Sequence, residues 1–126
     1  MKVEISVGEF LDKITILEIK SERINDPEKL SSVSKELAIL QDIWQASPYH
    51  SSNLTAEIAE LKTVNEALWK IEDDIRDKER RKLFDEEFIE LARAVYVTND
   101  KRAAIKRVIN LKTGSELIEE KSYSDY

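Results

Sequence analysis

The chain has 126 residues, of which 41% are apolar and 37% charged, with only two glycines and two prolines, so we expect one domain built from amphipathic helices. A net charge of −6 and a pI near 5.0 argue against nucleic-acid binding, because proteins that bind nucleic acids neutralise phosphates with Lys and Arg. There is no cysteine, no signal peptide and no run of ~18 apolar residues, so we expect a cytoplasmic protein without a membrane partner.

The N-terminal region predicts an extended arm followed by a helix over residues 7–24. Residues 2–7 alternate polar and apolar side chains, which is typical of extended backbone. Ser6 and Glu9 have the spacing of a capping box, in which each side chain satisfies a free N–H of the first turn. Ile16 and Ile19 lie off the main apolar stripe, so this helix is either central in the fold or contacts a second molecule.

The second helix is predicted over residues 27–46. Asp26 can cap its start, and Pro27 suits the first helical position. Its apolar stripe holds no polar residue, so we assign it a packing role. The loop over residues 47–53 holds the only histidine, His50. Without a cysteine or a second histidine, it makes neither a metal site nor a nucleophile pair.

Polar residues interrupt the apolar stripes of the third and fourth helices, predicted over residues 53–79 and 85–112. Asn65 and Glu72 lie on the stripe of the third helix. The fourth helix carries its polar residues in the same half of the bundle, and residues 98–100 leave open whether it is one helix or two. Gly114 suits the C-cap, and the acidic tail, residues 113–126, is expected to fold back on the basic end of this helix.

These elements predict an all-α protein: a four-helix, mostly antiparallel bundle in a single domain, residues 1–126, with an extended N-terminal arm and an irregular C-terminal tail. A polar cluster is expected between helices one, three and four. The candidate ligand-binding residues are Glu9, Asp12, Lys13, Asn65, Glu72, Asp73, Arg76, Arg93, Tyr96, Asn99, Asp100, Arg102 and Lys106.

Two interpretations of this cluster compete. In the first, Glu72 forms an internal ion pair with Arg102 or Lys106 that fixes the helix register, since a buried carboxylate needs a cationic partner. In the second, the same side chains line a partly open cleft that suits the phosphate or carboxylate of a small ligand.

The sequence lacks the patterns of most enzyme classes: there is no glycine-rich phosphate loop, no cysteine, no paired histidine and no Ser–His–Asp arrangement. We therefore expect a non-catalytic binding or interaction module without a cofactor, with a protein partner or a second copy of the chain. The alternative is a binder of small anions, or a Mg²⁺-dependent enzyme acting on nucleotides or sugar phosphates, that uses Glu72, Asp73, Asn99, Asp100 and Arg102.

Three blocks of the chain resemble a known family of small helical proteins from bacteria and phages. They are GEFLDKITILEIK at residues 8–20, LWKIEDDIR at residues 68–76, and LARAVY with TNDKR at residues 91–102; the tail, GS and EEKSY, is also similar. The family is known only as a domain of unknown function. The resemblance therefore implies a helical fold and no particular activity, although relatives sometimes accompany polysaccharide-related or tetratricopeptide-type proteins.

Overall fold

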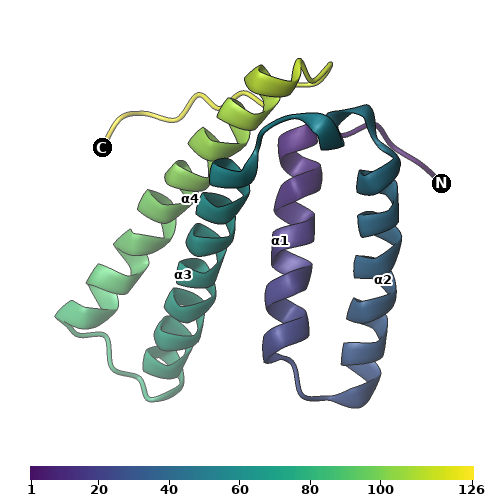
Figure 1. Ribbon diagram of the computed structural model, residues 1–126. Coiled ribbons are helices and arrows are strands. Elements are labelled where there is room, and N and C mark those ends of the chain that lie inside the picture. Colours follow the sequence, from purple (N-terminus) through teal and green to yellow (C-terminus); the bar gives the residue numbers. More distant parts are fainter.

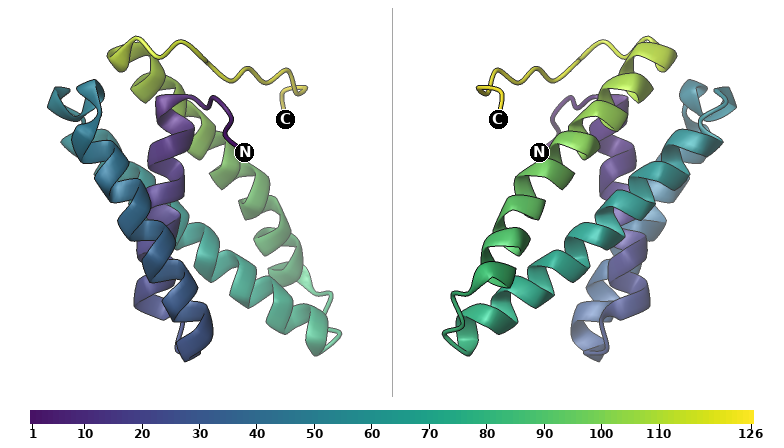
Figure 2. Two further views of the ribbon diagram at one scale, coloured as in Figure 1. Left: turned by 90° about the vertical axis from the view of Figure 1, so that its right-hand side faces the viewer. Right: turned by 90° about the vertical axis from the view of Figure 1, so that its left-hand side faces the viewer.

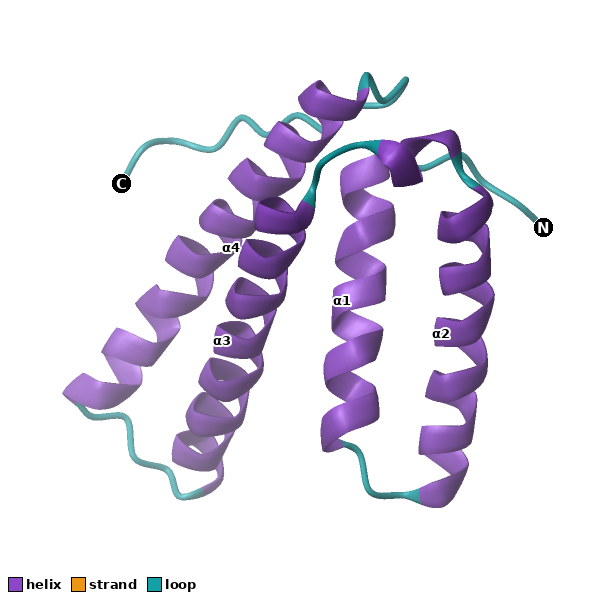
Figure 3. Ribbon diagram, in the orientation of Figure 1, coloured by secondary structure: helices purple, strands orange, loops and turns teal.

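A computed structural model describes residues 1–126 and contains four α-helices, one short 3-10 helix and no strand (Figure 3). The elements are α1 (Val7–Arg23), α2 (Pro27–Ala46), η1 (Pro48–Ser51), α3 (Thr55–Arg80) and α4 (Glu86–Thr113). The all-α class is confirmed, and every predicted helix boundary lies within two residues of the observed one.

Successive helices run antiparallel, so α1 pairs with α2 and α3 pairs with α4 (Figure 1). The two hairpins lie close together at the η1 end and diverge toward the opposite end (Figure 2). Only α1 packs extensively against all three other helices, whereas the main helical neighbour of α2 is α1. The core therefore lies around α1, and the far ends of α3 and α4 extend away from it.

The central position of α1 explains why so much of its surface is apolar. Leu11, Ile14, Leu17 and Ile19 are all buried, and Ile19 is only 1% exposed. The central position predicted for α1 is confirmed, whereas contact with a second molecule stays a prediction. Ile19 packs inside the chain, and Ile16 is half-buried.

The first turn of α1 is capped by side chains from the far end of the chain. Ser6 Oγ accepts a hydrogen bond from the Glu9 backbone N–H at 3.1 Å, as the sequence predicts. Asn110 Oδ1 accepts from the Gly8 N–H at 2.7 Å, and Ser115 Oγ accepts from the Val7 N–H at 3.2 Å. The first N–H groups of a helix have no partner within it, so α4 and the residue after it complete α1.

The capping box predicted at this position is only half formed. The Glu9 carboxylate turns instead to Lys106 on α4, with Oε2 2.6 Å from Nζ. The absence of a side chain at position 8 lets the two helices approach, because a Cβ on Gly8 would lie 2.6 Å from the Lys106 carbonyl oxygen. Glycine is therefore required where α1 crosses α4.

Helix α4 is continuous, so the break considered at residues 98–100 does not occur. Asn99 and Asp100 line cavities beside the helix, and the backbone stays helical through both residues. The helix ends at Gly114 in the left-handed conformation, with φ of 66°, and its N–H donates to the Asn110 carbonyl. The predicted C-cap is confirmed.

The C-terminal tail folds back along α4, as its charge predicts. Glu120 pairs with Arg107 at 2.7 Å, and Glu119 lies 3.6 Å from Lys106. At the end of the tail the Tyr126 ring packs on Tyr96, with ring centroids 5.3 Å apart. None of the helices has both the length and the apolar character that spanning a membrane requires.

Candidate functional site

A buried hydrogen-bond network joins α1 to α3. Asn65 Nδ2 donates to Asp12 Oδ1 and to Thr15 Oγ1, both at 2.9 Å. The Thr15 hydroxyl in turn donates to the Asp12 backbone carbonyl at 2.9 Å. All three residues are buried. The sequence predicts both Asn65 and Asp12 in the cluster. It does not predict that Asp12 is buried, because Asp12 lies on the polar side of α1.

This network sets the orientation of the Asn65 amide. A carboxylate can only accept hydrogen bonds, so the NH₂ group of Asn65 must face Asp12 and its oxygen must face away. That oxygen accepts a hydrogen bond from Arg102 Nη1 on α4 at 3.3 Å. Asp12, Asn65 and Arg102 thus form a chain of contacts from the buried side of α1 to a half-buried guanidinium group on α4.

Lys106 lies one turn further along α4 and is surrounded by three acids, two from α1 and one from the tail. Its Nζ is 2.6 Å from Glu9, 4.0 Å from Asp12 and 3.6 Å from Glu119. The predicted internal ion pair of Glu72 with Arg102 or Lys106 is therefore wrong. Glu72 pairs instead with Arg76, one turn along α3, at 3.1 Å.

Arg102 lies between two cavities. The first, which we call the polar groove, has a volume of about 450 Å³ and lies between α1, α3 and α4; it is lined by Ile16, Lys20, Asn65, Leu68, Trp69, Glu72, Asp73, Asn99 and Arg102. The second, the tail cavity, has a volume of about 400 Å³ and is lined by Val95, Tyr96, Asn99, Asp100, Arg102, Lys121, Tyr123 and Tyr126. Both volumes are in the range of small-molecule sites.

The structure divides the predicted site residues into several groups. Glu9, Asp12 and Lys106 belong to the buried contacts, and Asn65 and Arg102 join those contacts to the polar groove. The other groove residues from the predicted set are Glu72, Asp73 and Asn99, while Tyr96 and Asp100 line the tail cavity. Arg76 reaches the site only through Glu72, and Lys13 and Arg93 are exposed and line neither cavity.

Several contributing residues are not among the candidates, and Thr15, Lys20 and Trp69 are examples. Lys20 forms no ion pair and lines the polar groove. Thr15 and Asp12 are three residues apart on α1, which places them on one face. That spacing is the signal that could have identified the partners of Asn65.

One wall of the tail cavity is formed by Tyr126, which is 78% exposed. A hydrogen bond with Asp100, followed by desolvation and the charge of the Asp100 carboxylate, raises the pKa of the Tyr126 hydroxyl above its ordinary value. A tyrosine hydroxyl is protonated at neutral pH even without this shift, so it can donate to the carboxylate.

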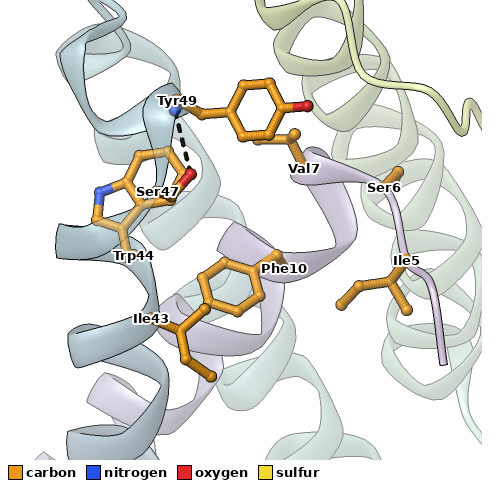
Figure 4. Close-up of a pocket in the computed structure, with 8 residues that line it drawn as sticks. All are labelled: Ile5, Ser6, Val7, Phe10, Ile43, Trp44, Ser47 and Tyr49. Atoms are coloured by element: carbon orange, nitrogen blue, oxygen red, sulfur yellow. Dashed lines mark hydrogen bonds between the residues drawn. The ribbon is translucent and has the colours of Figure 1, made fainter. Parts of the chain in front are cut away.

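A third cavity, of about 170 Å³, is apolar and lies between the start of α1, the end of α2 and the N-terminal arm (Figure 4). The Phe10 and Trp44 rings stack across it with centroids 6.2 Å apart, and Ser47 Oγ accepts from the Tyr49 N–H at 3.1 Å. Its volume is below that of typical ligand sites, and it offers few polar groups to orient a ligand. We assign it to packing.

No group of three or more His, Cys, Asp or Glu side chains converges where it could hold a metal ion. Glu72 and Asp73 share the polar groove, but their carboxylates are not joined there by a third acid. The polar side chains of the groove are two cations, two amides and two carboxylates: Lys20, Arg102, Asn65, Asn99, Glu72 and Asp73.

The Glu9–Lys106 ion pair predicts how stability depends on pH. Burial raises the pKa of Glu9, but the hydrogen bonds of its carboxylate with Lys106 and Glu119 outweigh burial and hold the pKa below 4.5. A carboxyl whose pKa falls on folding stabilises the protein above its unfolded pKa, and this contribution is lost as the pH falls through the folded pKa. As the pH drops below about 4.5, we expect the melting temperature of the wild type to decrease. The melting temperature of Glu9→Gln should be lower than that of the wild type at pH 7, but it should decrease less below pH 4.5.

Thermal melts followed by circular dichroism from pH 7 to pH 3 test this prediction. Glu28→Gln is the matched control, because Glu28 is exposed at the start of α2 and its side chain forms no ion pair. Its curve should run parallel to that of the wild type. If the Glu9→Gln curve is also parallel to that of the wild type, the Glu9–Lys106 pair does not contribute to the loss of stability in acid.

Comparison with known proteins identifies the family. No curated protein and no solved structure matches the chain. One family model matches, over residues 1–126. The match covers the helices, both cavities around Arg102 and the tail. The chain therefore belongs to the family of unknown function DUF6165.

Proposed function

We propose that this protein is a non-catalytic binding module whose polar groove holds the anionic group of a small ligand. The observation that carries the proposal is that most hydrogen-bond donors of Arg102 have no acceptor within the chain. A guanidinium has five N–H donors, and Arg102 uses one of them, for Asn65 Oδ1 at 3.3 Å. It forms no ion pair and borders both the polar groove and the tail cavity.

The position of Arg102 favours binding because its orientation is prepared in advance. The Asp12–Asn65 hydrogen bond directs the Asn65 oxygen toward Arg102, and the contact with this oxygen helps to hold the guanidinium in place. Functional side chains held by a second set of buried contacts lose less freedom when they bind. A phosphate or carboxylate can then accept two parallel hydrogen bonds from Arg102.

The other polar residues of the groove suggest which ligands fit. Lys20 adds a second cation that forms no ion pair, and Asn99 adds an amide. Asp73 lies in the same groove without an ion pair, and the charge of Glu72 is balanced by Arg76. This arrangement favours a ligand with an anionic group near Arg102 and hydroxyl or amino donors near Asp73.

Thermal-shift and NMR titrations with inorganic phosphate, a sugar phosphate, a nucleotide and a dicarboxylate test the proposal. We expect at least one of these compounds to raise the melting temperature and to shift the amide signals of α3 and α4 around the groove. Arg102→Gln should weaken its binding roughly 30-fold or more, because a charge-assisted bidentate contact is lost.

Arg93→Gln is the matched control, because Arg93 lies on the same helix, is exposed and forms no ion pair. Phosphate stabilises many proteins without a site, so a shift alone proves nothing. Equal shifts in Arg102→Gln and Arg93→Gln, or no response to any of the four compounds, would contradict the proposal.

A further inference from the structure

The side of the α3–α4 hairpin that faces away from α1 and α2 is not covered by any part of the chain; in the right-hand view of Figure 2, α3 and α4 lie in front of the other two helices. We call it the outer face. Its residues are Ala56, Ala59, Glu60, Thr63, Val64 and Ala67 on α3, and Lys101, Ala104, Ile105, Val108 and Leu111 on α4.

The outer face combines an apolar ridge with an adjacent groove. On α4, Ala104, Val108 and Leu111 are spaced by four and three residues and form one stripe. Val108 is 44% exposed and Leu111 is 59% exposed. On α3 the facing residues are small, among them Ala59 and Thr63, and they leave a groove of about 520 Å³ beside the stripe.

The total exposed surface of the chain is larger than that of a compact monomer. It measures 8831 Å², whereas a compact protein of 14.6 kDa exposes roughly 6,900 Å². The extended arm and tail account for part of the difference of roughly 1,900 Å². A stable dimer needs about 800 Å² from each partner, so the excess leaves room for such an interface.

Charges on the outer face are self-complementary. Glu60 on α3 and Lys101 on α4 line the groove from opposite sides, and neither forms an ion pair or a side-chain hydrogen bond within the chain. Because α3 and α4 run antiparallel and Glu57 pairs with Lys112, Glu60 lies at the level of Val108. Lys101 lies seven residues before Val108 on α4, so a two-fold axis in the plane of the face, at right angles to the line from Glu60 to Lys101, would bring Glu60 of one copy opposite Lys101 of the other.

We propose that a second copy of this chain docks on the outer face about such a two-fold axis. The Val108 side chains of the two copies meet on this axis, with Leu111 of each copy beside them. The two Glu60–Lys101 pairs flank this apolar centre and set the angle at which the two hairpins cross. A two-fold interface uses the same patch on both copies, which matches a face that carries both the ridge and its groove.

Light scattering and sedimentation of the full chain, from low micromolar to near-millimolar concentration, test the proposal. We expect a mass of twice 14.6 kDa for the wild type and a mass of 14.6 kDa for Leu111→Asp. Ile39→Asp is the matched control, because Ile39 is 50% exposed on α2, which is remote from the outer face. It should stay dimeric, and the Leu111→Asp monomer should keep the helical circular dichroism of the fold.

A charge exchange tests the Glu60–Lys101 pairs. Lys101→Glu alone should weaken the dimer at least tenfold, because two acids then face each other in each pair, and Glu60→Lys combined with Lys101→Glu should restore it. Three results would overturn the proposal: a wild type that is monomeric at every concentration, a dimer that survives Leu111→Asp, or a double variant no stronger than Lys101→Glu.

Discussion

Asn65→Leu is expected to lower the free energy of unfolding by about 3 kcal/mol, because a buried charged acceptor then loses its donor. In the wild type the Asn65 amide donates to Asp12 Oδ1 and to Thr15 Oγ1, both at 2.9 Å. Leucine has a similar volume but no donor, so Asp12 would stay buried with only Lys106 within 4.0 Å. Urea unfolding at pH 7 measures the loss.

Asn99→Leu is the matched control for this experiment. Asn99 lies in the same groove, is half-buried and forms no side-chain hydrogen bond, so we expect a change within about 0.5 kcal/mol. A double-mutant cycle of Asp12→Ala with Asn65→Ala should give a coupling energy above about 1 kcal/mol. If Asn65→Leu and Asn99→Leu cost the same, the Asp12–Asn65 contact does not hold α1 to α3.

Gly8→Ala is expected to destabilise the fold by about 2 kcal/mol, because a new methyl group would be forced into a filled space. The added Cβ would lie 2.6 Å from the Lys106 carbonyl oxygen and 3.0 Å from Asn110 Oδ1. The α1–α4 crossing would have to open, and the Gly8 N–H would lose its acceptor. Thermal unfolding of the two proteins measures the difference.

The sign of this effect distinguishes packing from helix propensity. Within a helix, alanine is more favourable than glycine by about 1 kcal/mol, so propensity alone predicts that Gly8→Ala stabilises. The second glycine gives a comparison, because nothing lies near a Cβ on Gly114 and its φ is 66°. Gly114→Ala should cost about 1 kcal/mol through the backbone alone. A Gly8→Ala variant more stable than the wild type would show that α1 and α4 do not pack as described.

The helices could be predicted because their signals are local. Asp26 and Pro27 at the start of α2, and Gly114 after α4, act on the residues next to them. Residues 98–100 left the continuity of α4 open for the same reason, since their local preference for a break is overridden by the packing of α4 on α1 and α3. The uncovered outer face could not be foreseen, because it depends on the angle between the hairpins.

The sequence predicts which residues form the cluster, but not which of them pair with each other. Helical spacing placed Asn65 and Arg102 in one cluster, and the structure joins them at 3.3 Å. Glu72 was expected to cross to α4, yet it reaches Arg76 on its own helix. Which cation a carboxylate meets depends on the relative rotation of two helices. A shift of one residue turns a side chain by ~100°, and a sequence pattern does not determine that rotation.

The capping of α1 by Asn110 and Ser115 has a consequence for biosynthesis. The groups that complete the first helix lie 102 and 108 residues after the N–H groups they bind. A ribosome delivers α1 before these acceptors, so the first N–H groups of α1 are left to water until residues 110 and 115 have emerged. A chain cut before residue 110 therefore loses contacts at the start of α1 as well as the end of α4. The first helix to be synthesised is completed only by one of the last helices to fold onto it.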